Sequence, residues 1–345
     1  MTGEKPILGL GLSRVLLSHG GGGSQTEALL GEHFFPHLIA PHGERRGDSA
    51  ILSAGPARIA FTTDSFVVKP WRFPGGDIGR LAVCGTVNDL TAAGARPQWL
   101  SLGLILEEGF AAADLASVAV SIQQAATEAS VEIVTGDTKV VERGRGDGIY
   151  INTAGIGIIE GDAIPHLARA EPGDAVIVTG TVGDHGAAIM QARESFGLVG
   201  PVASDVAPLG GLIDSLRAAG VAAHVLKDPT RGGLAMAANE IAEASGVAIR
   251  LDERALPVKP SVARLLDLLG LDVFEVANEG KMIVIVPPGE AEPALRGLRA
   301  HPLGREAAVI GEVSASGDAI VTVTTRAGGE RMLIKPAGEA LPRIC

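Results

Sequence analysis

The sequence predicts two domains that each combine β-strands with α-helices, as α+β or α/β layers. Three observations support this fold class. The chain has 345 residues, which is enough for two domains of ordinary size. Segments with the hydrophobic period of strands alternate with helical segments in both halves. The pattern breaks between residues 160 and 173, at Pro165, Pro172 and Gly173, so we place the domain boundary near residue 165.

The first half is expected to begin with an irregular, glycine-rich stretch over residues 1–50. Asp77 is expected to cap a helix over residues 78–93, which Gly94 and Pro97 would end. The other expected elements of this half are strands over residues 59–63, 100–106, 131–135 and 150–159, a loop over 70–76 and a helix over 115–129.

The second half repeats the alternation of strands and helices. Thr230 is expected to cap a helix over residues 232–245. The other expected elements are strands over residues 175–179, 247–251, 281–286 and 319–324, and helices over 185–195, 208–219 and 262–269. We therefore expect one domain over residues 1–165, a second over 166–335, and a tail over 336–345.

Composition and charge exclude several classes of protein. Hydrophobic residues make up 46% of the chain and aromatic residues 3%, which predicts a sizeable core filled by aliphatic side chains. The net charge is −11, so the chain lacks the excess of basic residues that nucleic-acid-binding proteins carry. The same charge does not favour binding to an anionic membrane surface. No apolar run approaches 18 residues, no signal peptide is evident, and two cysteines are too few for a disulfide framework. We expect a soluble cytoplasmic protein.

Several carboxylates are expected at strand ends or helix starts, beside glycine or hydroxyl residues. Carboxylate oxygens are the ligands that Mg²⁺ prefers, and Mg²⁺ commonly accompanies the phosphates of a nucleotide. Aspartates at such junctions are also ordinary caps and turn residues, so only the whole set suggests a site. The set is Asp48, Asp64, Asp77, Asp89, Asp137 and Asp228.

The last ten residues carry a thiol at the end of a proline-containing segment. Extended chain of this length spans about 33 Å, which is enough to fold back into a cleft. Cys345 would then bring a strong nucleophile to a site elsewhere in the fold. The alternative is a frayed terminus with a tolerated free thiol. Cys84 falls within the helix over 78–93 and is interpreted as a small core residue.

Taken together, eight segments resemble a known family. The chain is similar to the HypE family of hydrogenase maturation factors, within the superfamily of aminoimidazole ribonucleotide synthetase (PurM). The terminal Pro-Arg-Ile-Cys is the most discriminating segment. The segments that carry the resemblance are 19–23, 63–68, 73–79, 85–90, 136–141, 228–233, 277–281 and 342–345.

The resemblance implies an α+β fold of two PurM-like domains, in which the N-terminal sheet pairs with its twin in a homodimer and ATP binds between the domains. It also implies a reaction. A carbamoyltransferase, HypF, would load a carbamoyl group on the terminal thiol. The chain would then dehydrate the thiocarboxamide to a thiocyanate with ATP, and the HypC–HypD scaffold complex would take the cyanide for the iron of a [NiFe] hydrogenase.

The resemblance also implies roles for individual residues. Cys345 would carry the substrate, Glu279 is the candidate base, and Asp89 is expected to share that role. Lys139 and Arg231 are expected to stabilise phosphate charge. The residues expected at ATP are Asp48, Asp64, Asp89, Asp137, Thr138, Asp228 and Arg231. Of these, Asp48, Asp64, Asp89 and Asp228 are expected to bind Mg²⁺.

Other readings compete with this one. Selenophosphate synthetase is the nearest relative within the superfamily, but it would want a reactive cysteine near the N-terminal glycine-rich loop, and no cysteine precedes Cys84. A thiamine phosphate kinase or a ribonucleotide synthetase would use the same aspartates without explaining the terminal cysteine. A nucleotide-binding scaffold whose tail serves as a docking peptide is the non-enzymatic alternative.

Overall fold

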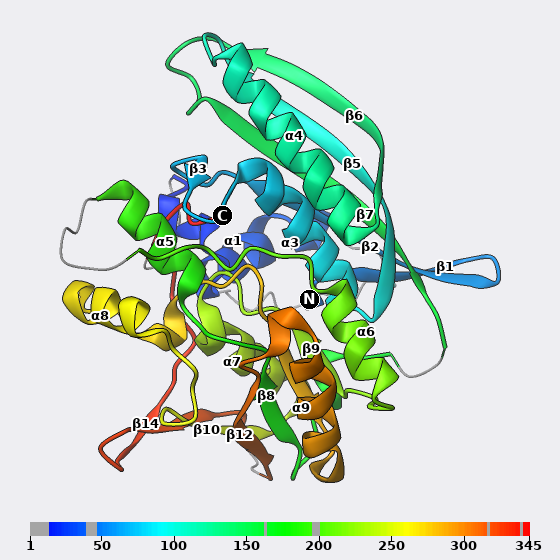
Figure 1. Ribbon diagram of the computed structural model, residues 1–345, viewed down its shortest axis with the longest axis vertical. Helices are drawn as coiled ribbons and strands as arrows, with labels where there is room; N and C mark the ends of the chain where they lie inside the picture. The colour runs from blue at the N-terminus through cyan, green and yellow to red at the C-terminus, as the bar shows by residue number, and fades with distance from the viewer. Residues whose placement is uncertain (1–13, 39–46, 162–163, 195–200, 316–317, 339–340) are drawn as a thin grey trace, which may run out of the picture.

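The computed structural model describes residues 14–38, 47–161, 164–194, 201–315, 318–338 and 341–345. The chain forms two large β-sheets with helices packed on them, one sheet from each half (Figure 1). All strands of the first sheet lie before residue 160, and all strands of the second lie after residue 174. The boundary near residue 165 stays a prediction. Among the described residues, every helix is too short or too polar to cross a bilayer.

The first sheet has five strands in the order β1-β2-β7-β5-β6. Only β5 and β6 pair in parallel, and the other neighbours pair antiparallel. Because no described strand pairs with the outer side of β6, that strand forms an edge of the sheet. The strands are β1 (Ala50–Ala54), β2 (Ala57–Phe66), β5 (Ala95–Glu107), β6 (Glu132–Val141) and β7 (Ile149–Ile159).

Helix α3 (Ile78–Ala92) is the central element of the first half. It packs on β2, β5 and β7, and on α4 (Ala112–Ala129). The carboxylate of Asp77 accepts a hydrogen bond from the Arg80 main-chain nitrogen at 2.9 Å, which confirms the predicted cap. Nearly every residue of α3 is buried, so the helix is anchored on all sides. A short hairpin of β3 (Arg72–Phe73) and β4 (Gly76–Asp77) precedes it.

The second sheet has seven strands in the order β14-β13-β10-β12-β8-β11-β9. Helices cover both of its faces: α7 packs on one, and α6 and α9 pack on the other. The strands are β8 (Ala175–Val178), β9 (Val225–Lys227), β10 (Ala248–Asp252), β11 (Ile283–Val286), β12 (Ala308–Ser314), β13 (Val321–Thr324) and β14 (Glu330–Met332). The helices of this half are α5 (Asp184–Arg193), α6 (Gly210–Ala218), α7 (Gly233–Ser245), α8 (Pro260–Leu269) and α9 (Ala291–Ala300).

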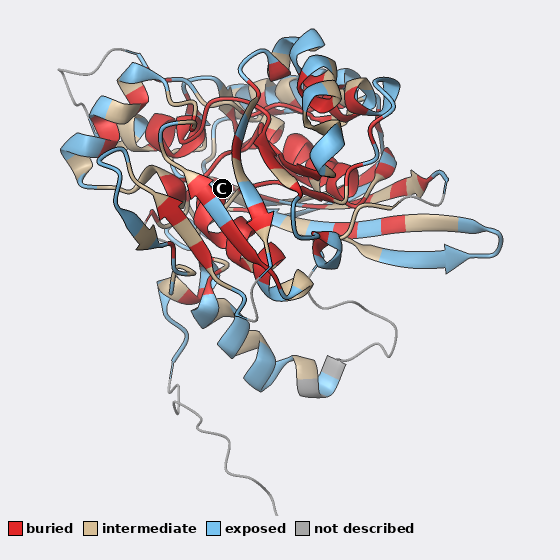
Figure 2. Cartoon of the chain, turned by 90° about the horizontal axis from the view of Figure 1, so that it is seen from below, coloured by how far each residue is buried: buried red, intermediate tan, exposed pale blue. Residues whose placement is uncertain are grey.

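Short helices complete the fold. Two of them, α1 (Ser24–His33) and α2 (Phe35–Leu38), lie in the stretch expected to be irregular. That expectation was wrong for α1. None of its residues is buried, so its sequence carries no apolar face from which a helix could be predicted. The 3₁₀ helices are η1 (Leu17–Gly20), η2 (Leu167–Arg169), η3 (Val273–Glu275), η4 (Pro288–Glu290) and η5 (Pro302–Gly304). Figure 2 shows buried residues concentrated in both halves, with the β1–β2 hairpin projecting from them.

Three local predictions were wrong. Strand β6 continues to Val141 because its parallel partner β5 runs on to Glu107, so Asp137 lies inside a strand and not at its end. Asp64 likewise lies inside β2. Thr230 does not cap α7: the N-cap is Gly232, whose φ of 73° belongs to the left-handed region that favours glycine. Strands β1, β3, β4, β9, β12 and β14 and helix α9 were not predicted, and the β3–β4 pair lies where a loop over 70–76 was expected.

The end of the chain folds back between the two halves of the molecule (Figure 1). Leu341 and Ile344 are buried, and both pack in the core cluster that contains α3. The Lys69 main-chain nitrogen donates to the Arg343 carbonyl at 3.2 Å, and the Val67 nitrogen donates to the Cys345 carbonyl at 3.1 Å. The alternative of a frayed terminus is therefore wrong for residues 341–345.

Candidate active site

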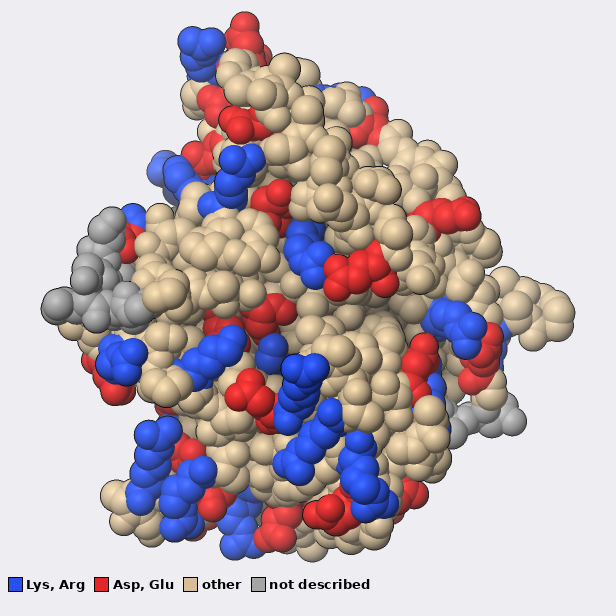
Figure 3. All heavy atoms as spheres, viewed as in Figure 1, with Lys and Arg blue, Asp and Glu red and all other residues tan. Residues whose placement is uncertain are grey.

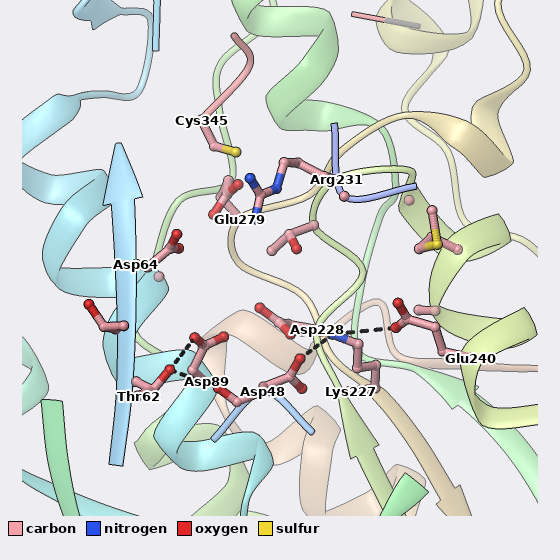
Figure 4. A pocket seen from close by; sticks show the side chains of 17 residues that line it. Asp48, Thr62, Asp64, Asp89, Lys227, Asp228, Arg231, Glu240, Glu279 and Cys345 are labelled. Atoms are coloured by element: carbon pink, nitrogen blue, oxygen red, sulfur yellow. Dashed lines mark hydrogen bonds and ion pairs between the residues drawn. The ribbon is translucent and has the colours of Figure 1, made fainter. Parts of the chain in front are cut away.

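A pocket of about 230 Å³ lies between the two halves of the chain (Figure 4). One wall comes from β2 and α3, and the other comes from β9, α7 and the loops beside them. The end of the tail closes one side. The lining residues are Gly22, Asp48, Thr62, Thr63, Asp64, Gly85, Asp89, Lys227, Asp228, Thr230, Arg231, Gly233, Met236, Ala237, Glu240, Glu279 and Cys345.

Three carboxylates meet at one end of the pocket. Asp48 precedes β1, Asp89 lies in the last turns of α3, and Asp228 follows β9 directly. One ligand oxygen from each lies within 4.8 Å of the others. The Thr62 hydroxyl lies 2.9 Å from Asp89 Oδ2 and 2.7 Å from the Asp48 main-chain oxygen, which ties β2 to the group. We call Asp48, Asp89 and Asp228 the carboxylate cluster.

The electrostatics of the carboxylate cluster suit a divalent cation. Burial raises the pKa of Asp48 to about 7, although the charge of Lys227 lowers it. Burial and the charge of Asp228 raise the pKa of Asp89 well above its ordinary value. Lys227 Nζ forms ion pairs with Asp48 and, at 3.4 Å, with Asp228. The carboxylates are thus hard to ionise together without a cation, and a bound divalent ion would stabilise their charged forms. Carboxylate oxygens are the ligands of Mg²⁺, so the donor set fits that ion.

The other end of the pocket holds the thiol. Figure 4 shows Cys345, Glu279 and Arg231 gathered there, away from the carboxylate cluster. Glu279 is buried, and its Oε1 has no hydrogen-bond partner among the described residues. Burial, followed by the charges of Asp228 and Asp64, raises the pKa of Glu279 well above its ordinary value. A buried carboxyl oxygen without a partner is costly, and such groups are found at functional sites.

Asp205 holds the Glu279 segment in place. Its carboxylate accepts hydrogen bonds from the main-chain nitrogens of Glu279 and Gly280, each at 3.2 Å, and from Lys281 Nζ at 3.1 Å. Burial alone would raise the pKa of Asp205, but the charge of Lys281 holds it below its ordinary value. A Cβ at Gly280 would lie 1.8 Å from the Asp205 main-chain oxygen, so the close approach requires glycine.

The structure brings most of the predicted site residues to one pocket. Asp48, Asp64, Asp89, Asp228, Arg231, Glu279 and Cys345 all line it. Asp64 lies on β2 and does not belong to the three-residue carboxylate cluster. The roles of these residues stay predictions.

Asp137, Thr138 and Lys139 do not reach this pocket. They lie on the exposed edge strand β6, where Lys139 Nζ donates to Asp137 Oδ2 at 2.5 Å. That hydrogen bond lowers the pKa of Asp137. Nothing in the local sequence distinguishes these residues from the aspartates that do meet, because the assignment depends on which strand forms the edge of the sheet.

Sequence reasoning assigned no role to three residues that shape the site. Lys227 directly precedes the segment 228–233 and forms ion pairs with two members of the carboxylate cluster. Asp205 and His185 were not considered, since each acts through residues far away in the chain. For Lys227, one available signal was its position directly before Asp228, in a charged connection that continues to Gly232 and Gly233.

Comparison with known proteins finds relatives over both halves of the chain. Residues 46–159 match the family model described as AIR synthase related protein, N-terminal domain, and residues 171–324 match the model of the C-terminal domain. Carbamoyl dehydratase HypE of Azotobacter vinelandii is 47% identical over 333 residues, which cover 96% of this chain and 97% of that protein.

Two solved structures are similar over most of the chain. A crystal structure of a HypE–HypF complex has a TM-score of 0.84 at 47% identity and covers 90% of this chain and 100% of that one. A crystal structure of hydrogenase maturation protein HypE in complex with ATP has a TM-score of 0.81 at 46% identity and covers 96% and 100%.

Proposed function

The chain belongs to the HypE family of carbamoyl dehydratases, and from this premise we propose how its pocket carries out the reaction. The protein is an ATP-dependent enzyme of hydrogenase maturation, which dehydrates an S-carbamoyl group on Cys345 to a thiocyanate. The product supplies the cyanide ligand of the [NiFe] hydrogenase iron. The observation that carries the assignment of residues is the position of Cys345, which lines the same pocket as Glu279 and the carboxylate cluster.

The chemistry explains why a nucleotide is consumed. The oxygen of a thiocarboxamide leaves poorly as hydroxide, so its conversion to a phosphate ester provides a better leaving group. The γ-phosphoryl group of ATP moves to that oxygen and ADP is released. The nitrogen then loses its protons, phosphate departs, and the C≡N bond forms. Such a reaction depends mostly on positioning and on neutralising phosphate charge.

Glu279 is the base that we propose to accept the proton from nitrogen. Its carboxyl group lies at the same end of the pocket as Cys345, and its Oε1 makes no other hydrogen bond among the described residues. Since a carboxylate with a raised pKa is a stronger base once it is ionised, its environment suits this task. Arg231 lies beside it, which supports the proposal that its guanidinium stabilises phosphate charge. Asp89 is the second candidate for the base.

Asp48, Asp89 and Asp228 would hold Mg²⁺, with Asp64 as the fourth predicted ligand. When bound, the ion would neutralise phosphate charge. The carboxylate cluster and Cys345 line different ends of one pocket, which supports a layout in which the triphosphate lies between them (Figure 4). Lys227 contacts Asp48, Asp228 and Glu240, and it restrains the two that belong to the carboxylate cluster, so their ligand oxygens converge before the ion arrives.

We also propose the partners that the family implies. HypF is supported by the solved HypE–HypF complex of a relative. The HypC–HypD complex would receive the cyanide, and the location would be the cytoplasm. No nucleic-acid partner is proposed, since acidic and basic side chains are interspersed on the face in Figure 3 and the net charge is −11.

A homodimer is supported by the edge strand β6. Its residues are exposed over almost the whole strand, and they include the apolar side chains Ile133, Val134 and Val140. A long exposed apolar edge strand favours pairing with another chain. Asp137, Thr138 and Lys139 do not reach the pocket of their own chain, so any role in catalysis requires a second copy to bring β6 to it.

Mass spectrometry of the C-terminal peptide tests the proposed function. Incubation with the carbamoyltransferase, carbamoyl phosphate and ATP should add a carbamoyl group to that peptide, followed by the loss of one water. The Cys345→Ala variant should show neither change. A Glu279→Gln variant should bind ATP and accept the carbamoyl group but lose water slowly. Loss of water at the normal rate would remove Glu279 as the base.

A further inference from the structure

The main-chain carbonyl groups of the last four residues are all hydrogen bonded. Arg193 Nη2 donates to the Pro342 oxygen at 2.8 Å and to the Arg343 oxygen at 2.6 Å. His185 Nε2 lies 2.8 Å from the Ile344 oxygen. The Cys345 oxygen accepts from the main-chain nitrogen that follows β2. Two side chains of one helix, α5, therefore contact three consecutive carbonyl groups of the tail.

The hydrogen bonds around His185 determine which ring nitrogen carries the proton. The Ile344 main-chain oxygen can only accept, so His185 Nε2 carries the proton and donates to it. In the neutral ring Nδ1 is then the acceptor, and the Ser204 hydroxyl donates to it at 2.8 Å while Ser204 Oγ accepts from the Val206 main-chain nitrogen at 3.1 Å. The ring is fully buried, and the edge of Phe73 packs against it at 5.4 Å between centroids. Burial lowers the pKa of His185, so the ring is neutral near pH 7.

The Arg193 side chain contacts the tail at main-chain oxygens of the tail. Its Nε donates to the Lys69 oxygen at 2.7 Å, and Nη2 donates to two tail carbonyls. One guanidinium thus joins α5, the segment after β2 and the tail. A planar group with several donors suits such a junction, and lysine would not reproduce it.

We propose that His185 and Arg193 position the tail for dehydration, and that His185 aims the Cys345 side chain at Glu279. The peptide between Ile344 and Cys345 is planar. Its oxygen is held by His185, and the following carbonyl is held by the Val67 nitrogen, so both sides of the Cys345 Cα are restrained. These contacts exist only while the tail is inward. This inference rests on the proposed function and assigns positioning residues, not catalytic ones.

The test measures two steps separately on the full-length protein, the carbamoylation of Cys345 by HypF and the dehydration that follows. His185→Leu fills the site with an apolar side chain of similar size but removes the N–H group that donates to the Ile344 oxygen. His185→Gln restores a side-chain N–H donor. We expect His185→Leu to dehydrate carbamoylated Cys345 about tenfold more slowly, which is the effect of one lost hydrogen bond. Its rate of carbamoylation by HypF should be unchanged or higher, and His185→Gln should recover part of the dehydration rate.

A second readout follows the thiol directly. Without HypF, the rate at which iodoacetamide modifies Cys345 should rise severalfold in His185→Leu and in Arg193→Gln. The matched control is His224→Leu, which removes a partly buried histidine that contacts Asp174 outside the pocket. Arg193→Gln also keeps the test valid if His185→Leu fails to fold, because Arg193 is only half-buried.

The outcomes distinguish this inference from the proposed function. If the protein without substitutions forms no thiocyanate, the proposed function fails. If it forms thiocyanate, but His185→Leu and Arg193→Gln dehydrate and react with iodoacetamide at its rates, the positioning roles are wrong. Equal slowing of carbamoylation and dehydration would also overturn them, since a general structural defect would act on both steps.

Discussion

Helix α3 and the C-terminal tail line the same pocket, and each carries one of the two cysteines of the chain. Helix α3 is held by buried side chains along its whole length, and it brings Asp89 to the carboxylate cluster. The tail is held by two buried aliphatic side chains, Leu341 and Ile344, and by hydrogen bonds to its main chain. The difference is between a wall of the site buried along a whole helix and a segment with few anchoring side chains, which we predict to be released.

An estimate of energies supports that distinction. Burial of two aliphatic side chains contributes about 3–6 kcal/mol. Ordering five residues costs about 5–10 kcal/mol. The tail hydrogen bonds contribute about 1 kcal/mol each. The free energies of the inward tail and of a released tail are therefore expected to be similar. Two tail states, one outward for loading and one inward for chemistry, remain a prediction that this balance favours.

The largest expected difference between the two regions is the reactivity of their thiols. Burial raises the pKa of Cys84 to about 12, so its thiolate is about one part in 10⁴ at pH 8. Iodoacetamide should therefore modify Cys345 at least about 10³-fold faster than Cys84. Peptide mapping over a time course measures both rates. Comparable modification of the two would show that α3 opens as readily as the tail.

The next effect concerns the carboxylate cluster. Asp89→Asn removes one charged ligand without changing the shape of α3. We expect dehydration to fall about 10²- to 10³-fold, the usual cost of a lost electrostatic contact in a transition state. Loading of Cys345 by HypF should stay within about twofold, because it uses the released tail. The matched control is Asp214→Asn, an exposed acid on α6 that pairs with Arg217. A parallel loss of both steps would show that the two regions are not independent.

The smallest expected effect lies near the end of the tail, at Arg343. Arg343, which has a left-handed φ of 57°, forms an ion pair with Asp147 and donates to the Val67 oxygen at 3.0 Å. The pair is partly exposed, so it contributes about 1 kcal/mol or less. Asp147→Asn should therefore raise the iodoacetamide reaction rate of Cys345 by no more than about fivefold. The matched control is Asp114→Asn, an exposed acid of α4.

The same contact predicts a pH dependence. Hydrogen bonds from Lys69 and Arg343 hold the pKa of Asp147 below its ordinary value. Its contribution to the inward tail is therefore complete above about pH 4 and is lost only as the pH falls below that. The effect of Asp147→Asn on the thiol reaction should thus be the same at pH 6 and at pH 8. A difference between these pH values would assign the titration to another group.

Local elements could be predicted where short-range physics decides them. The Asp77 cap and the buried periodicity of α3 are contained in a few adjacent residues, and both were predicted correctly. Elements with weak local signals were missed, such as the exposed α1 and the three-residue β9. The predicted extent of β6 was wrong because its length depends on pairing with β5. The whole of helix α4 separates these two strands in the sequence.

The sequence by itself determined the family, the motifs and the identity of most pocket residues, because these depend on residue types and spacing. Only the tertiary structure decided that Asp48, Asp89 and Asp228 meet while Asp137 and Lys139 face outward on β6. The physical reason is that strand order and packing bring distant segments together, and a carboxylate has the same local signature in either place. The contacts of Asp205, His185 and Arg193 depend on that packing alone.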